Sequence, residues 1–232
     1  MGAGNITHII FDFDGLLVDT EHLYTKASQM MLDKFGLEFT MDIKRRMMGK
    51  KHMEAIKWLI DEVGIADKIT PEEYAKEYDA WLDVAYLSAP ALPGAKRLVE
   101  HFAAKKIPMA ICTGSCSRTF ALKNTGHGDW TSAIPLKVCT GDDPNVKHGK
   151  PHPEPFLYTM KQFNEPNLRP ENCLVFEDAP NGVEAALAAG MNCIMVPDLS
   201  IFAPDDTFKA RLSRCLASLE EFLPEEFGLP PY

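Results

Sequence analysis

The chain has 232 residues, of which 46% are hydrophobic and 25% charged, and its formal net charge is −9. This composition is ordinary for a globular protein, and the length suits one large domain or one domain with an insert. The acidic balance argues against a nucleic-acid surface, which would be rich in lysine and arginine. No apolar run approaches the ~18 residues of a membrane span, and the first residues lack the pattern of a signal peptide. We therefore expect a cytoplasmic monomer that binds neither nucleic acid nor membrane.

The cysteine pattern gives no indication of a disulfide framework or a zinc site. Six cysteines are spread along the chain without a CxxC pair or nearby histidines in zinc-finger order. Most of them lie in or beside apolar runs, where a thiol behaves as a small hydrophobic side chain. We expect reduced, mostly structural cysteines, as is usual in the cytosol.

Short apolar runs alternate with amphipathic stretches through most of the chain. Runs typical of buried strands, each ending in polar or Gly/Pro residues, cover residues 6–13, 108–113, 137–140, 172–176 and 192–196. Helical periodicity precedes or joins these runs at 95–105, 155–163 and 182–189. Alternation of this kind predicts an α/β fold with a Rossmann-like parallel sheet covered by helices on both faces.

One segment interrupts this alternation. Between residues 20 and 87 no strand pattern is found, and helical patterns cover 21–35, 41–48, 53–63 and 71–87. This is far longer than a simple crossover of about 12 residues. We interpret it as a small α-helical cap domain (19–89) inserted into a catalytic core (1–18 and 90–232), with hinges at 17–21 and 88–94.

Chemically active side chains follow several of the predicted strands. Asp12 and Asp14 end the first strand before a turn at Gly15, Thr113-Gly114-Ser115 ends the second, and Glu177-Asp178 ends the fourth. Lys150 lies between the third strand and the helix that follows it. Because the carboxyl ends of parallel strands form the ligand-binding edge of such sheets, we expect these residues to meet there.

Together these residues suit the transfer of a phosphoryl group. One carboxylate could attack phosphorus while the other handles protons, and Mg²⁺ would relieve the repulsion between crowded acids. The Thr113 hydroxyl, the N–H groups of Gly114 and Ser115, and the Lys150 ammonium could bind phosphate oxygens. Each residue alone has a plain structural explanation as a turn, a helix cap or a solvated lysine. Their joint occurrence is what favours a site.

Competing motifs do not occur in the sequence. It contains no GxxxxGK[ST] loop, no GxGxxG fingerprint and no GxSxG elbow. The histidines show no metal-ligand spacing, and we interpret His148 and His152, which flank Lys150, as exposed loop residues.

Four segments resemble the haloacid dehalogenase-like hydrolases, in that family's order and over the whole chain. They are FDFDGLLVDTE (11–21), ICTGS (111–115), HGKPHPEPF (148–156) and VFEDAPNGVEAALAAGM (175–191). The insert after the first segment resembles the family's helical cap. The resemblance implies Asp12 as nucleophile, Asp14 as general acid and base, Thr113 as phosphate ligand and Lys150 as the neutralising lysine. It also implies a magnesium site that involves Asp12, Asp14, Asp178 and Glu177, and phosphate contacts from Gly15, Gly114, Ser115 and Lys150, with Lys50 of the cap as a further contact.

Further segments are similar to the branch of the family that hydrolyses pseudouridine 5′-phosphate. They are MGKK (48–51), GDDPNVKHGKPHPEPF (141–156) and FGLPPY (227–232), whereas TGS at 113–115 departs from the TSS expected there. Asp14 favours phosphate chemistry over carbon–halogen cleavage. A sugar-phosphate phosphatase of broader specificity stays open as an alternative. A β-phosphoglucomutase-like isomerase is the other, although its cap histidine, twelve residues after the nucleophile, is here Tyr24.

Overall fold

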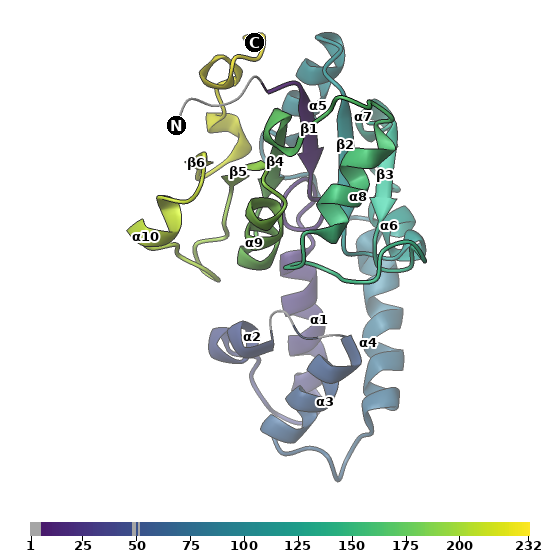
Figure 1. The fold of residues 1–232 in the computed structure, drawn as a ribbon. Helices are drawn as coiled ribbons and strands as arrows, with labels where there is room; N and C mark the ends of the chain where they lie inside the picture. Colours follow the sequence, from purple (N-terminus) through teal and green to yellow (C-terminus); the bar gives the residue numbers. More distant parts are fainter. Residues whose placement is uncertain (1–5, 48–49, 51) are drawn as a thin grey trace. The chain divides into compact units, whose positions relative to one another are not determined.

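The structure is a computed structural model, which describes residues 6–47, 50 and 52–232. Within these residues, six parallel strands form one sheet in the order β3-β2-β1-β4-β5-β6 (Figure 1). The strands are β1 (His8–Phe11), β2 (Met109–Thr113), β3 (Leu136–Cys139), β4 (Cys173–Glu177), β5 (Asn192–Met195) and β6 (Arg214–Cys215). This order is doubly wound, and the parallel sheet confirms the α/β class predicted from the alternating pattern.

Helices connect the strands of the sheet. Between residues 90 and 232 these helices are α5 (Ala95–Ala104), α6 (Ser117–Lys123), α7 (Gly128–Thr131), α8 (Glu154–Gln162), α9 (Pro180–Ala188) and α10 (Asp206–Lys209). Short 3-10 turns lie at Pro170–Asn172, before β4, and at Leu219–Glu221 and Pro224–Phe227, after β6. The helix α5 and the pair α8 and α9 match the predicted helices to within two residues. The short elements α6, α7, α10 and β6 were not predicted, because their two to seven residues carry too little periodicity to recognise.

The central strands are buried on both faces, and successive side chains point to opposite sides. Ile10 and Val175 belong to one core cluster with Phe156 of α8 and Val183 of α9. On the other face, the paired residues Phe11 and Phe176 have ring centroids 5.2 Å apart. Phe102 of α5 and Phe222 pack against them, with centroids 6.4 Å from Phe11 and 5.0 Å from Phe176, respectively. Two layers of side chains therefore hold β1 and β4 in fixed register.

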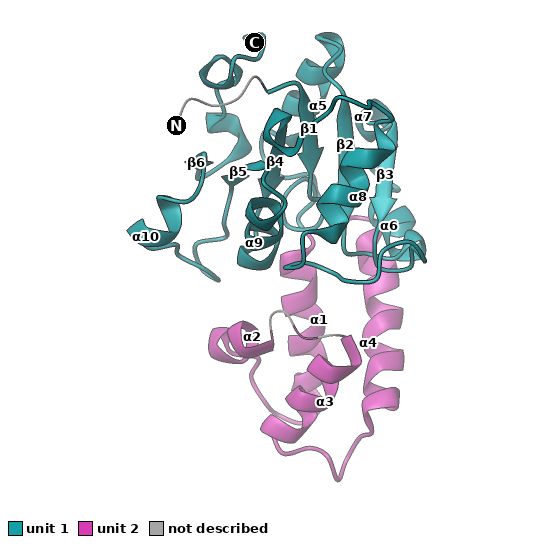
Figure 2. Cartoon of the chain, in the orientation of Figure 1, with its two compact units in different colours: residues 1–19, 90–232 teal, residues 20–89 magenta. Residues whose placement is uncertain are grey.

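The chain divides into two compact units, residues 1–19 with 90–232 and residues 20–89 (Figure 2). The second unit contains α1 (Glu21–Asp33), α2 (Met41–Met47), α3 (His52–Glu62) and α4 (Pro71–Tyr86). Its helix α4 begins with a capping box, in which Thr70 and Glu73 satisfy each other's backbone N–H groups. Each helix lies within two residues of its predicted range. The last predicted residue of the second range, Met48, lies outside the described residues.

No helix in the described part of the chain is long and apolar enough to cross a membrane. The six cysteines are all free thiols.

Candidate active site

The carboxyl ends of β1 and β4 lie side by side at the centre of the sheet. Strand order runs from β1 to β2 and β3 on one side and continues with β4 on the other. A parallel sheet opens a crevice for ligands where its order reverses in this way. The Asp12 N–H continues the pairing by donating to the Phe176 carbonyl at 2.9 Å. The backbone therefore fixes Asp12 beside the end of β4.

The ammonium group of Lys150 is the centre of a first group of charges. Its Nζ atom is 2.5 Å from Asp12 Oδ1 and 2.6 Å from Glu177 Oε1, and it donates a third hydrogen bond of 3.0 Å to the Cys112 carbonyl. All three of its donors are therefore used. Asp12 is 6% exposed and Glu177 is 1% exposed. Because water is largely excluded, each charge depends on these partners.

The electrostatics of Asp12 reflect its position among buried acids. Burial raises the pKa of Asp12, Lys150 lowers it, and the charges of Glu177 and Asp14 raise it again, so that it lies at about 7. Burial alone would lower the pKa of Lys150, but the charges of Asp12 and Glu177 outweigh it and hold that pKa well above the ordinary value. The lysine therefore stays charged, and Asp12 requires a further positive charge to be fully ionised near neutral pH.

Asp178 completes a set of carboxylates that could hold a metal ion. Carboxylate oxygens of Asp12, Glu177 and Asp178 lie within 4.8 Å of one another. Three carboxylates against the single Lys150 ammonium leave two negative charges, which a divalent cation would balance. Hard oxygen ligands of this kind suit Mg²⁺. The donor set thus fits the ion that the sequence predicts.

Gly182 of α9 makes room for the Glu177 side chain. A Cβ atom at this position would lie 2.0 Å from the carboxyl carbon and Oε1 of Glu177. The Glu177 Oε2 atom accepts a hydrogen bond of 3.2 Å from the Asp178 N–H. Both oxygens of Glu177 are therefore held, one by Lys150 and the other by the backbone of the next residue.

Asp14 belongs to a second group of polar side chains. Its Oδ2 atom accepts hydrogen bonds from the hydroxyls of Thr113 at 3.0 Å and Ser115 at 2.8 Å. Its Oδ1 atom is 2.6 Å from Lys123 Nζ. Gly15, with φ of 77°, turns the chain after Asp14, and its N–H donates to the Val18 carbonyl at 2.9 Å. Two aspartates separated by one residue therefore have different lysine partners.

Lys123 was not predicted from the sequence. It ends α6, and its side chain is 2% exposed. In the sequence it stands between leucine and asparagine at a helix end, a position where a solvated lysine is common. One signal was available, since Phe120 lies three residues earlier and therefore shares a helix face with it.

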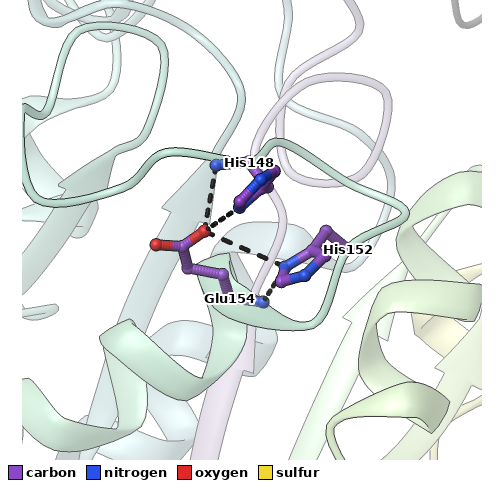
Figure 3. Close-up of side chains that lie close together, drawn as sticks. All are labelled: His148, His152 and Glu154. Carbon is purple, nitrogen blue, oxygen red and sulfur yellow. Dashed lines mark hydrogen bonds and ion pairs between the residues drawn. The ribbon is translucent and has the colours of Figure 1, made fainter.

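The loop that carries Lys150 is held on both sides of the lysine by Glu154, the first residue of α8 (Figure 3). Before the lysine, Glu154 accepts hydrogen bonds from the N–H groups of Lys147 at 3.2 Å and His148 at 3.0 Å, and its Oε2 atom lies 2.7 Å from His148 Nδ1. After it, the Glu154 N–H donates to His152 Nδ1 at 3.2 Å. Both histidines are exposed. We interpret the cluster as a set of hydrogen bonds that fixes the conformation of the loop around Lys150.

The remaining predicted site residues have these positions. Gly114 is exposed, and a Cβ atom there would meet nothing within 4 Å. The Ser115 N–H, which we expected to face phosphate, donates to the Thr113 hydroxyl at 3.0 Å in this structure. Lys50 belongs to the helical unit, where its exposed side chain lies 5.6 Å from the ring centroid of Trp58. Of the MGKK segment, residues 48, 49 and 51 lie outside the described residues.

A family described as haloacid dehalogenase-like hydrolase matches residues 9–196. The chain belongs to this family. The matched range includes Asp12, Lys150 and Glu177 of the site, and it also includes the whole helical unit. This finding confirms the family resemblance expected from the four segments.

Named relatives narrow the chemistry of this hydrolase. The (DL)-glycerol-3-phosphatase 1, mitochondrial, of Arabidopsis thaliana is 43% identical over 100% of this chain and 76% of its own length. The probable pseudouridine-5′-phosphatase of Drosophila melanogaster is 39% identical over 98% of this chain and 96% of its own. This hydrolase is accordingly a phosphoric monoester hydrolase.

A solved structure supports the fold independently. The structure of a family hydrolase from Deinococcus radiodurans R1 superposes with a TM-score of 0.79 at 24% identity, and the match covers 98% of this chain and 99% of that one.

Proposed function

We propose that this hydrolase is a Mg²⁺-dependent phosphatase that forms an aspartyl-phosphate on Asp12. The observation that carries the proposal is the Lys150 ammonium, which lies 2.5 Å from Asp12 Oδ1 and 2.6 Å from Glu177 Oε1 at the centre of the sheet edge. A lysine in this position screens a buried carboxylate and would let the phosphate dianion approach it.

In the proposed reaction, the two aspartates, which have different lysine partners, take different roles. An Asp12 oxygen bonds to phosphorus while the bond from phosphorus to the ester oxygen breaks, and Asp14 gives its proton to that oxygen. Asp14 then takes a proton from water as the water oxygen attacks phosphorus, and the Asp12–phosphorus bond breaks. Thr113, which donates to Asp14 in this structure, would contact phosphate together with the N–H groups of Gly114 and Ser115.

Magnesium fits this scheme through Asp12 and Asp178, with the Asp14 backbone carbonyl as a third protein ligand. Bound there, the ion would shield the nucleophile and the phosphate oxygens from each other's charge. Glu177 lies within reach of the same place, but both its oxygens already accept hydrogen bonds, from Lys150 and from the Asp178 N–H. We therefore assign Glu177 chiefly to holding Lys150.

The helical unit, residues 20–89, is proposed to act as a cap on the catalytic core. Caps of this kind exclude water during the reaction and open to release product. The proposed hinges lie at the two chain crossings near residues 19–20 and 89–90, and Lys50 would contribute a positive charge to the substrate from the cap. We also infer that the protein acts as a cytoplasmic monomer without nucleic-acid or membrane partners, which size-exclusion chromatography and cell fractionation would test.

The proposed substrate is pseudouridine 5′-phosphate. It is supported by the similarity of residues 141–156 to that branch of the family and by the relative from Drosophila melanogaster. Glycerol 3-phosphate is a second candidate, because the relative from Arabidopsis thaliana is named for it. The TGS segment at 113–115 departs from the TSS expected of the pseudouridine branch, and Gly114 offers only its backbone.

The test is phosphate release from a panel of monoesters with and without Mg²⁺, with Asp12→Asn as the blank. The panel contains pseudouridine 5′-phosphate, uridine 5′-phosphate, glycerol 3-phosphate, hexose 6-phosphates and β-glucose 1-phosphate. We expect metal-dependent release with the highest kcat/KM on pseudouridine 5′-phosphate. A preference for glycerol or hexose phosphates would keep the chemistry and reject the substrate. Conversion of β-glucose 1-phosphate to the 6-phosphate without release would reject hydrolysis in favour of a mutase.

A further inference from the structure

Lys123 is a buried lysine that the scheme above does not use. Its side chain is 2% exposed, and its Nζ atom lies 2.6 Å from Asp14 Oδ1 and donates a 2.7 Å hydrogen bond to Ser115 Oγ. Lysine is rarely buried to this degree unless its charge has a specific partner. One turn earlier on α6, Phe120 packs edge-on against Phe13 with ring centroids 4.7 Å apart. This contact anchors α6 to the residue between the two aspartates.

The hydrogen bonds around Lys123 have a fixed direction. An ammonium group only donates, so Ser115 Oγ must accept from it. The hydroxyl of Ser115 has a single proton, which is then directed to Asp14 Oδ2 at 2.8 Å. Lys123 therefore acts on both oxygens of Asp14, on Oδ1 directly and on Oδ2 through Ser115. These contacts leave the carboxylate little freedom to rotate.

We propose that Lys123 is a positioning residue for proton transfer by Asp14 and stabilises the negative charge that develops on Asp14 as its proton passes to the leaving oxygen. This inference rests on the proposed function. It adds a second lysine with a separate task, since Lys150 serves Asp12 and Lys123 serves Asp14. A preorganised charge beside a group that gains charge in the transition state lowers the barrier without contacting substrate.

The leaving group distinguishes this role from a structural one. An alkoxide needs a proton as it departs, whereas a nitrophenolate departs without one, so only alkyl phosphates depend on Asp14 in the first step. For Lys123→Met we expect kcat/KM, which reports the steps up to formation of the aspartyl-phosphate, to fall by about 10- to 100-fold on the best alkyl phosphate of the panel, within the ~10²–10⁴-fold that general acid catalysis contributes. On 4-nitrophenyl phosphate the loss of kcat/KM should stay below about threefold.

The experiment measures kcat and KM at saturating Mg²⁺ for the wild type, Lys123→Met, Asp14→Asn and the double variant. If Lys123 acts through Asp14, adding Lys123→Met to Asp14→Asn should change kcat/KM on the alkyl phosphate by less than about threefold, because coupled residues are not additive. Equal losses on both substrates, or the full loss in the Asp14→Asn background, would overturn the proposal. A wild type that releases no phosphate would instead reject the proposed function.

Two further variants guard against a trivial loss of structure. Lys44→Met removes another buried lysine, which pairs with Glu21 and Thr25 in the helical unit, and should leave the ratio of alkyl to nitrophenyl turnover unchanged. If circular dichroism shows that Lys123→Met does not fold, Ser115→Ala replaces it, because this change removes the directed hydroxyl alone. Ser115→Ala should lower the same ratio, and an unchanged ratio would overturn the proposal.

Discussion

Two groups of charges at the same sheet edge use the same residue types in different ways. In the first, the Lys150 ammonium donates to Asp12 at 2.5 Å, to Glu177 at 2.6 Å and to the Cys112 carbonyl at 3.0 Å. In the second, the Lys123 ammonium lies 2.6 Å from Asp14 Oδ1 and donates a hydrogen bond to the Ser115 hydroxyl beside it. The first arrangement gathers acids for an electrophile or a metal, and the second restrains one acid for proton transfer. Two aspartates one residue apart thus acquire separate roles from their surroundings.

The largest effect should come from removing the carboxylate of the first group. Asp12→Asn should lower kcat by about 10⁴-fold or more, because the nucleophile is lost. The loss should be equal for alkyl and nitrophenyl phosphates, whereas Asp14→Asn should lower kcat/KM mainly on alkyl phosphates. Steady-state phosphate release from both substrates measures this. Near-normal turnover of Asp12→Asn would show that the first group does not hold the nucleophile.

Removal of Lys150 should lower the free energy of unfolding of the protein more than removal of Lys123. Lys150→Met leaves two buried carboxylates without their cation, and such a change costs about 3–5 kcal/mol in the free energy of unfolding. Lys123→Met should cost less, because the Asp14 side chain is 19% exposed and keeps two hydroxyl donors. Urea unfolding at pH 8 without Mg²⁺ measures both. A larger loss of unfolding free energy for Lys123→Met than for Lys150→Met would show that the second group depends more on its lysine.

The raised pKa of Asp12 predicts that the stability of the protein depends on pH. Its pKa of about 7 lies above its ordinary value of 3.8. Between pH 4 and 7, therefore, the folded state holds a proton that the unfolded state has lost. The free energy of unfolding should then fall as pH rises through this window, by up to about 4 kcal/mol at about 1.36 kcal/mol per pKa unit.

The contribution of Asp12 to this pH dependence of stability can be isolated with the Asp12→Asn variant and with Mg²⁺. In EDTA, the wild type should lose stability relative to Asp12→Asn between pH 4 and 7, and saturating Mg²⁺ should flatten the difference. Parallel stability curves for the two proteins in EDTA would show that Asp12 does not titrate in this range.

Two glycines allow each group to be disturbed without removing a charge. Gly182→Ala places a Cβ 2.0 Å from the Glu177 carboxyl carbon, whereas Gly141→Ala places one 2.6 Å from the Gly114 carbonyl oxygen in the loop before Ser115. We expect kcat to fall by about 10-fold in each case, which corresponds to about 1.4 kcal/mol. Gly182→Ala should act equally on both types of leaving group, and Gly141→Ala mainly on alkyl phosphates.

Gly128→Ala is the matched control for both changes, since nothing lies within 4 Å of its added Cβ and its φ is ordinary. It should change neither kcat nor the thermal midpoint. Identical substrate patterns for Gly182→Ala and Gly141→Ala would show that the two groups act as one.

The sequence by itself determined the α/β class, the long helical insertion and the residues that follow the strands. These follow from local pattern, because a buried parallel strand must be apolar throughout and its carboxyl end is where polar residues gather. It also contained the family's four segments, which point to phosphate chemistry at Asp12. The short strand β6 and the short helix α6 show no recognisable pattern in the sequence, because elements of so few residues depend on tertiary contacts for stability.

Only the tertiary structure decided which charge faces which. In the sequence Lys123 and Lys150 are two lysines among others, and their partners lie 109 and 138 residues away, at Asp14 and Asp12. Their roles depend on side-chain burial and on the direction of hydrogen bonds, which arise when distant segments pack together. Burial removes the water that would otherwise screen each charge, so that a separation of 2.6 Å between two atoms acquires chemical meaning.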